Sequence, residues 1–162
     1  MNLKKKNWLT IKDLKFNDCL ELLKFYDEKN FSYSKWIENI IQKHNYKFDK
    51  KKLPINLKKV SLKELGFTDF QVLTKIYQKL EDLNYKLVPP EIALYSRVLQ
   101  IDQPKGSWIR FATPLDQMID DDGVPHLPKI GYALNTYFIE TYWAYENAVF
   151  FPHNEFIVID NK

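Results

Sequence analysis

The stretch from Leu87 to Phe111, LVPPEIALYSRVLQIDQPKGSWIRF, decides how the chain is divided. Pro89 and Pro90 have a fixed φ and no backbone donor, so they interrupt any helix that precedes them. Pro90 still suits the first position of a new helix, because its missing amide hydrogen would have no partner there. We expect a helical turn over residues 90–95, followed by extended chain over 96–101.

A polar turn separates this segment from an aromatic strand. Asp102–Gly106 combines an aspartate that can bond its own backbone, a proline and a glycine that tolerates positive φ. In residues 107–113 the side chains alternate, so Trp108 and Arg110 share one side of the expected strand. If the two segments pair as a hairpin, Arg97 and Arg110 reach the same sheet face.

The segments on either side differ in their periodicity. Before the stretch, apolar residues recur at helical spacing, and good caps precede them. After it, short apolar and aromatic runs alternate as in strands. We predict helices over 18–29, 35–44 and 69–83, capped by Asn17, Ser34 and Thr68, and strands over 126–132, 135–144 and 155–160. The fold class is α+β: N-terminal helices followed by an antiparallel sheet of four to five strands packed against the 69–83 helix.

Charge is distributed unevenly along the 162 residues, although the net charge is only +3. Residues 1–64 hold 16 lysines against 8 acidic residues, a net charge of +8, whereas residues 65–162 have a net charge of −5. A basic loop with Pro54 follows the second helix. We therefore divide the chain into a basic helical N-terminal segment with its linker, 1–57, and an α+β body, 58–162.

Several features bear on the compartment. The chain has no apolar run of 18 residues or more, and its first residues, MNLKKKNW, lack the apolar stretch of a secretory signal. Cys19 is the single cysteine, so an internal disulfide is excluded. We expect a cytoplasmic protein that is not associated with a membrane.

A set of short motifs lies between about residues 58 and 160: VSLKELGF at 60–67, Pro90-Glu91, Arg97-Val98-Leu99, DQPKGSW at 102–108 and Asp122-Gly123. With these motifs, this part of the sequence resembles an uncharacterised family of small bacterial and phage-borne proteins. Strands after Gly123 are longer and more aromatic here than in that family. The resemblance implies no activity and no catalytic residues.

The sequence contains no complete motif for a metal or a cofactor. The run Asp120-Asp121-Asp122-Gly123 lacks acidic residues at the later positions of a calcium loop. The histidines lack the spacing of a zinc site. We predict no metal site, with Asp120 and Asp122 as the candidates if a divalent cation binds. There is no glycine-rich phosphate loop, so we expect no cofactor.

Other residues are candidates for catalysis or binding. Glu91, Asp121 and His126 carry the groups that general acid–base chemistry would need. Four more residues flank the polar turn and are candidates for binding a partner or for bracing the fold: Arg97, Gln103, Trp108 and Arg110.

Three hypotheses about function remain open. The first is a small intracellular binding or accessory module without catalysis, whose partner is a protein or a nucleic acid. The second is a hydrolase or nuclease-type enzyme that uses an Asp/Glu/His cluster. The third is a nucleic-acid-binding protein that uses its basic N-terminal helices, in which case binding would weaken steeply with salt.

Overall fold

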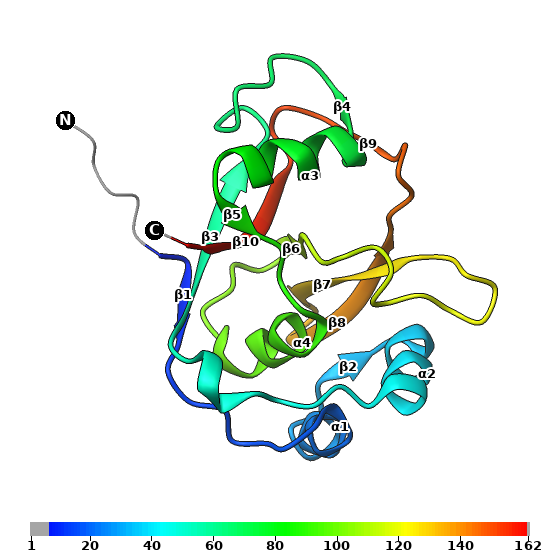
Figure 1. Ribbon diagram of the computed structural model, residues 1–162. Coiled ribbons are helices and arrows are strands. Elements are labelled where there is room, and N and C mark those ends of the chain that lie inside the picture. The colour runs from blue at the N-terminus through cyan, green and yellow to red at the C-terminus, as the bar shows by residue number, and fades with distance from the viewer. Residues whose placement is uncertain (1–6, 162) are drawn as a thin grey trace.

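The computed structural model describes residues 7–161 and shows an α+β fold in which four helices accompany a large curled sheet (Figure 1). The helices are α1 (Cys19–Glu28), α2 (Lys35–His44), α3 (Leu73–Asp82) and α4 (Pro90–Leu99), with a short 3₁₀ helix, η1 (Lys50–Lys52). The strands are β1 (Leu9–Ile11), β2 (Ser32–Tyr33), β3 (Ile55–Ser61), β4 (Gln71–Val72), β5 (Tyr85–Lys86), β6 (Trp108–Phe111), β7 (His126–Ala133), β8 (Thr136–Trp143), β9 (Val149–Phe150) and β10 (Glu155–Asp160).

The main sheet has the order β1-β3-β10-β6-β7-β8-β2, and β5 adds an eighth strand beside β10. It is mixed, because β10 runs parallel to β6 and β2 runs parallel to β8. The prediction of an antiparallel sheet with four to five strands was therefore wrong in both number and direction. Strands of two or three residues carry no detectable alternation, and the last strand inserts between β3 and β6, which are distant in sequence.

Helix α4 lies against the middle of the sheet, in contact with β7 and β8 (Figure 1). Pro90 occupies its first turn, as expected, but the helix continues to Leu99. The extended segment and the hairpin predicted around the polar turn are therefore wrong: β6 pairs with β7 and β10 instead. Residues from Ile92 to Arg97 are all buried, and such a helix shows little amphipathic pattern.

Helix α3 is shorter than predicted. Among the described residues, no side-chain hydrogen bond caps α3, and Gln71 Oε1, which a capping box would direct to the Thr68 amide, accepts the Val72 amide instead. Gln71 and Val72 instead form β4, which pairs with β9, and the helix begins at Leu73. It packs beside β4 and β5, whereas the helix that covers the central strands is α4.

Of the predicted caps for α1 and α2, the structure confirms only the one for α2. Ser34 Oγ accepts the Ile37 amide and begins α2, as predicted. Helix α1 is capped by Asp18, which accepts the Glu21 amide, rather than by the predicted Asn17. The strands predicted over 126–132, 135–144 and 155–160 are confirmed, with small differences in their ends, as β7, β8 and β10.

The N-terminal third contributes to the same sheet as the rest of the chain. Strand β1 lies beside β3 at one edge, and β2 lies beside β8 at the other. The apolar faces of α1 and α2 join one continuous core with the sheet residues. Within residues 7–161, none of the helices has both the length and the apolar character that crossing a membrane requires.

Candidate functional site

Arg97 is fully buried and bonded to the protein on several sides. Its Nη1 donates to Gln103 Oε1 at 2.7 Å and to the Gly131 carbonyl at 3.0 Å, and its Nη2 donates to the Gln100 carbonyl. The guanidinium lies 4.7 Å from the centre of the Tyr137 ring. Burial lowers the pKa of Arg97 to about 10, so the group stays charged at neutral pH.

Gln103 completes this connection. Its Nε2 donates to the carbonyls of Ser107 at 3.0 Å and Ile130 at 3.1 Å, so one amide joins the polar turn to β7. Gln103 is 4% exposed. Two of the four predicted binding residues, Arg97 and Gln103, therefore lie in the interior and hold α4, the turn and β7 together.

The other two predicted binding residues lie elsewhere. The Arg110 guanidinium lies 5.9 Å from the ring centre of Tyr142, whereas Arg97 contacts Tyr137. Because Tyr137 and Tyr142 are an odd number of residues apart on β8, they belong to opposite faces of the sheet. Trp108 is 42% exposed. Arg97 and Gln103 therefore lie in the interior on one face of the sheet, whereas Trp108 and Arg110 lie on the other face, where Trp108 is exposed.

His126 forms a close pair with Asp120. Its Nε2 lies 2.8 Å from Asp120 Oδ2, and its Nδ1 lies 3.5 Å from Thr141 Oγ1. The indole of Trp36 stacks on the imidazole, with ring centres 4.2 Å apart. His126 is 1% exposed. Because both ring nitrogens have protein partners and one ring face is covered, this geometry supports a structural role for His126.

Asp120 holds its own loop in place. Its Oδ1 accepts hydrogen bonds from the amides of Val124 at 2.8 Å and Asp122 at 2.9 Å. The bond from Val124 is the main reason that the pKa of Asp120 lies below its ordinary value. In the described part of the chain, no three histidine, cysteine or acidic side chains gather as a metal site would require.

The other two candidates for catalysis lie apart from His126. Glu91 is in the first turn of α4, where burial raises its pKa and Lys52 is the nearest opposing charge. Asp121 is exposed and pairs with Lys43 at 2.9 Å. The structure therefore does not bring Glu91, Asp121 and His126 together around one reacting centre.

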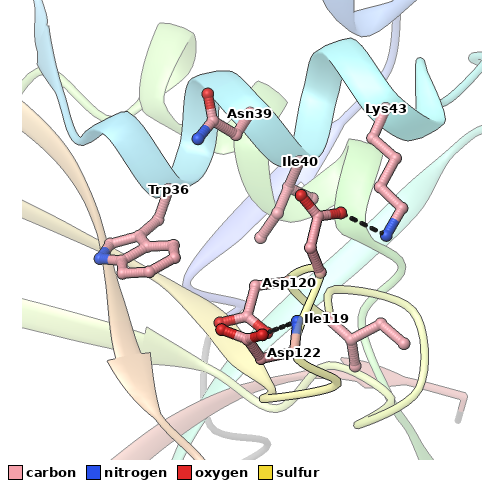
Figure 2. Close-up of a pocket in the computed structure, with 8 residues that line it drawn as sticks. Trp36, Asn39, Ile40, Lys43, Ile119, Asp120 and Asp122 are labelled. Carbon is pink, nitrogen blue, oxygen red and sulfur yellow. Dashed lines mark hydrogen bonds and ion pairs between the residues drawn. The ribbon is translucent and has the colours of Figure 1, made fainter.

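A pocket of about 410 Å³ opens between α2 and the loop that carries the aspartates (Figure 2). We call residues 119–122 the acidic loop. One wall is formed by α2 and the other by the acidic loop: Trp36, Asn39, Ile40 and Lys43 face Ile119, Asp120, Asp121 and Asp122. The pocket therefore presents an indole and carboxylates to the same space.

Exposed aromatic residues continue beyond this pocket. Trp36 is 43% exposed, Trp143 60% and Tyr145 40%, and Trp143 lies edge-on to both His126 and Tyr145. We call these three residues the aromatic rim. A second hollow of about 390 Å³ lies on the other side of the acidic loop, lined by Tyr145, Asp116 and Glu146 among others.

Trp36 is not among the candidate site residues of the sequence analysis, which therefore missed this surface. The available signal was an indole one position away from the buried Ile37, at the edge of the amphipathic stripe.

The N-terminal helices do not present a basic face. Helix α1 contains Lys24 together with Glu21, Asp27 and Glu28, and α2 contains two lysines and Glu38. Both lysines of α2 form ion pairs, with Glu38 and Asp121. The excess lysines lie in η1, in β3 and in the connecting segments, so the hypothesis of nucleic-acid binding through these helices gains no support.

The chain matches no family model, no curated protein and no solved structure. The family resemblance over residues 58–160 stays a prediction. The pocket between α2 and the acidic loop and the aromatic rim beside it are therefore the features that bear on function.

Proposed function

We propose that the protein is a small non-catalytic binding module that docks a basic segment of a partner protein. The docking site is the pocket between α2 and the acidic loop, together with the aromatic rim. One observation carries the proposal: the exposed indole of Trp36 and the carboxylates of the acidic loop line the same pocket.

The chemistry of this pocket suits a guanidinium or ammonium group. A cation is attracted to the face of an indole and to a nearby carboxylate, and both are available here. Tryptophan, tyrosine and arginine are also the residues that dominate binding energy at protein interfaces. Asp121 is 92% exposed in its pair with Lys43, so an incoming cation can replace that lysine at little cost.

The site is held in shape before any partner arrives. Asp120 is bonded to His126 and to two amides of its own loop, and Trp36 rests on His126. A rigid site loses less conformational entropy on binding than a mobile one, which favours affinity. His126 and Asp120 therefore serve as supports for the docking surface.

The compartment forms part of the same proposal. Cys19, the single cysteine, is buried as a free thiol, so nothing in the fold requires an oxidising environment. A basic segment of a cytoplasmic protein is the partner that we propose.

Titration of ¹⁵N-labelled protein with Ac-Arg-Arg-NH₂, followed by NMR, tests the proposal. The indole signals of Trp36 and Trp143 should shift progressively, while that of Trp8, which packs on the core residue Phe111, stays in place. The uncharged isostere Ac-Cit-Cit-NH₂ should cause no comparable shift.

Variants assign the effect to the pocket. The double substitution Asp121→Asn and Asp122→Asn should lower the affinity for Ac-Arg-Arg-NH₂ about tenfold or more, because charge-assisted hydrogen bonds are lost. Asp102→Asn, which removes an exposed carboxylate from the polar turn, is the matched control. If arginine and citrulline peptides shift the same signals equally, or neither shifts them, the proposal is wrong.

A further inference from the structure

The face of the sheet opposite α2 and α4 carries two rows of side chains in register. Trp108, Gly131 and Phe138 lie side by side across β6, β7 and β8, and Arg110, Lys129 and Glu140 form the next row. His126 and Tyr137, which contact α2 and α4, point to the other face because the alternation of strands places them there. We call the part of this opposite side that the two rows form the open face; next to it on the same side, Tyr142 is buried against Phe150.

The aromatic row offers flat surfaces to a ligand. Trp108 is 42% exposed, and its ring centre lies 6.0 Å from that of Phe138 across the glycine. Gly131 makes this possible, because a Cβ at that position would lie 2.5 Å from the indole. Lys129 Nζ lies 4.7 Å from the centre of the Trp108 ring, at the end of a flexible stem that can move aside.

The charged row contains an arrangement that is unfavourable without a ligand. Arg110 and Lys129 are direct cross-strand neighbours, and like charges at such positions destabilise a sheet. Within residues 7–161, neither cation has a carboxylate within ion-pair distance. Glu140, the cross-strand neighbour of Lys129 on β8, attracts Lys129 from the side away from Arg110 and offsets only part of the repulsion. An anion placed between Arg110 and Lys129 would relieve their repulsion.

We infer that the open face binds single-stranded nucleic acid, with bases stacked on Trp108 and Phe138 and the backbone phosphate held by Arg110 and Lys129. The two rows are two residues apart along each strand, about 7 Å, which lies within the reach of one nucleotide. This site lies on the opposite side of β7 and β8 from the pocket proposed above and does not depend on it.

A single strand fits this surface better than a duplex or a protein. Unpaired bases expose the flat faces that aromatic side chains on a sheet can stack against. A duplex hides those faces, and a basic protein segment would be repelled by Arg110 and Lys129. The ligand must be both aromatic and anionic, and a single-stranded nucleic acid is both.

Fluorescence anisotropy with labelled dT₁₂ and rU₁₂ tests the inference, with a 12-base-pair duplex for comparison. We expect binding to at least one single strand and weaker binding to the duplex. One phosphate held by both cations predicts a slope of about −0.7 for the logarithm of the binding constant against the logarithm of salt concentration. Excess UMP alone should compete poorly.

Substitutions on the open face locate the site. Trp108→Ala should lower the affinity about tenfold, and Trp108→Phe should restore part of it. Lys129→Ala should weaken binding and make the salt dependence shallower, because Arg110 alone then faces the phosphate. Phe70→Ala and Lys75→Ala, which remove an exposed aromatic and an exposed lysine elsewhere, are the matched controls and should bind normally.

Two results would overturn the inference. One is that neither dT₁₂ nor rU₁₂ binds at low salt, and the other is that the open-face and control variants lose affinity to the same extent. Full competition by UMP would indicate a mononucleotide site, and binding of a protein to the open face without any oligonucleotide binding would indicate a protein interface. The Trp108→Phe variant keeps the test valid if Trp108→Ala fails to fold.

Discussion

The side chain of Arg97 donates a hydrogen bond of 2.7 Å to Gln103, and this contact joins helix α4 to the polar turn that leads into β6. Gln103 in turn donates to a carbonyl of β7. The buried guanidinium is thus stabilised by hydrogen bonds to carbonyl oxygens and by the Tyr137 ring, and its contacts within residues 7–161 include no carboxylate. Such a cation is costly to leave without its partners.

Replacing either member of this pair should therefore destabilise the fold. Arg97→Ala removes the donor to Gln103 Oε1, to the buried Gly131 carbonyl and to the partly buried Gln100 carbonyl, and we expect a loss of about 3 kcal/mol or more in the free energy of unfolding. Gln103→Ala should cost about 2 kcal/mol. Urea unfolding of both single variants and the double variant measures the coupling, with Lys105→Ala as control. Strictly additive losses would show that the contact contributes nothing.

The cost of substituting Gly131 should depend on the indole of Trp108, because the two residues lie against each other. Gly131→Ala forces the indole off the sheet, and we expect a loss of about 1–2 kcal/mol in unfolding free energy. In a protein that already carries Trp108→Ala, the same substitution should cost less, because the indole is gone. Trp108→Ala itself should cost less than Arg97→Ala, since Trp108 is 42% exposed. Thermal unfolding of the three variants checks this.

Asp120 should make stability depend on acid pH. Its pKa is lower in the folded protein than in the unfolded chain, mainly because of the Val124 amide. The contribution of Asp120 is therefore complete above the unfolded pKa, near 4, and is lost as the pH falls through the folded value. The difference in unfolding free energy between the wild type and Asp120→Asn should shrink from pH 5 to pH 2. A constant difference would contradict this account.

Ser34, which caps α2, should contribute more to the free energy of unfolding than Thr68, the predicted cap that does not form. Ser34→Ala removes the bond to the Ile37 amide and should cost about 1 kcal/mol. Thr68→Ala alters an exposed residue outside any helix and should change unfolding free energy by less than about 0.5 kcal/mol. Chemical denaturation distinguishes the two. Equal effects would place a cap at Thr68 that the structure lacks.

Cys19 should be unreactive in the folded protein. Burial raises the pKa of its thiol far above the ordinary range, so the reactive thiolate is scarce. The linked contribution to stability is present below the unfolded pKa, near 8.5, and declines as the pH rises beyond it. Labelling with DTNB at pH 8 should proceed only after urea unfolding. Rapid labelling of the native protein would show that the thiol is accessible.

Local chemistry in the sequence accounts for much of the secondary structure. Ser34 before an apolar stripe predicted α2, and Ser61 with Glu64 forms the reciprocal bonds of a capping box. Pro90 marked the start of α4. These features depend on residues within one helical turn of each other, so the sequence alone reveals them. Apolar and aromatic runs of six residues or more predicted β7, β8 and β10 for the same reason.

Only the tertiary structure decided the sheet and the two proposed sites. The positions of β1, β2 and β10 depend on pairing between segments that are distant along the chain, and such pairing leaves no local signal. Long-range packing also gives Arg97 and Trp108 different roles. Both were candidates for binding, but α4 buries Arg97, whereas Trp108 lies on the other face of the sheet and is 42% exposed. Residue type determined what each side chain can bind, and long-range packing determined which of them a ligand can reach.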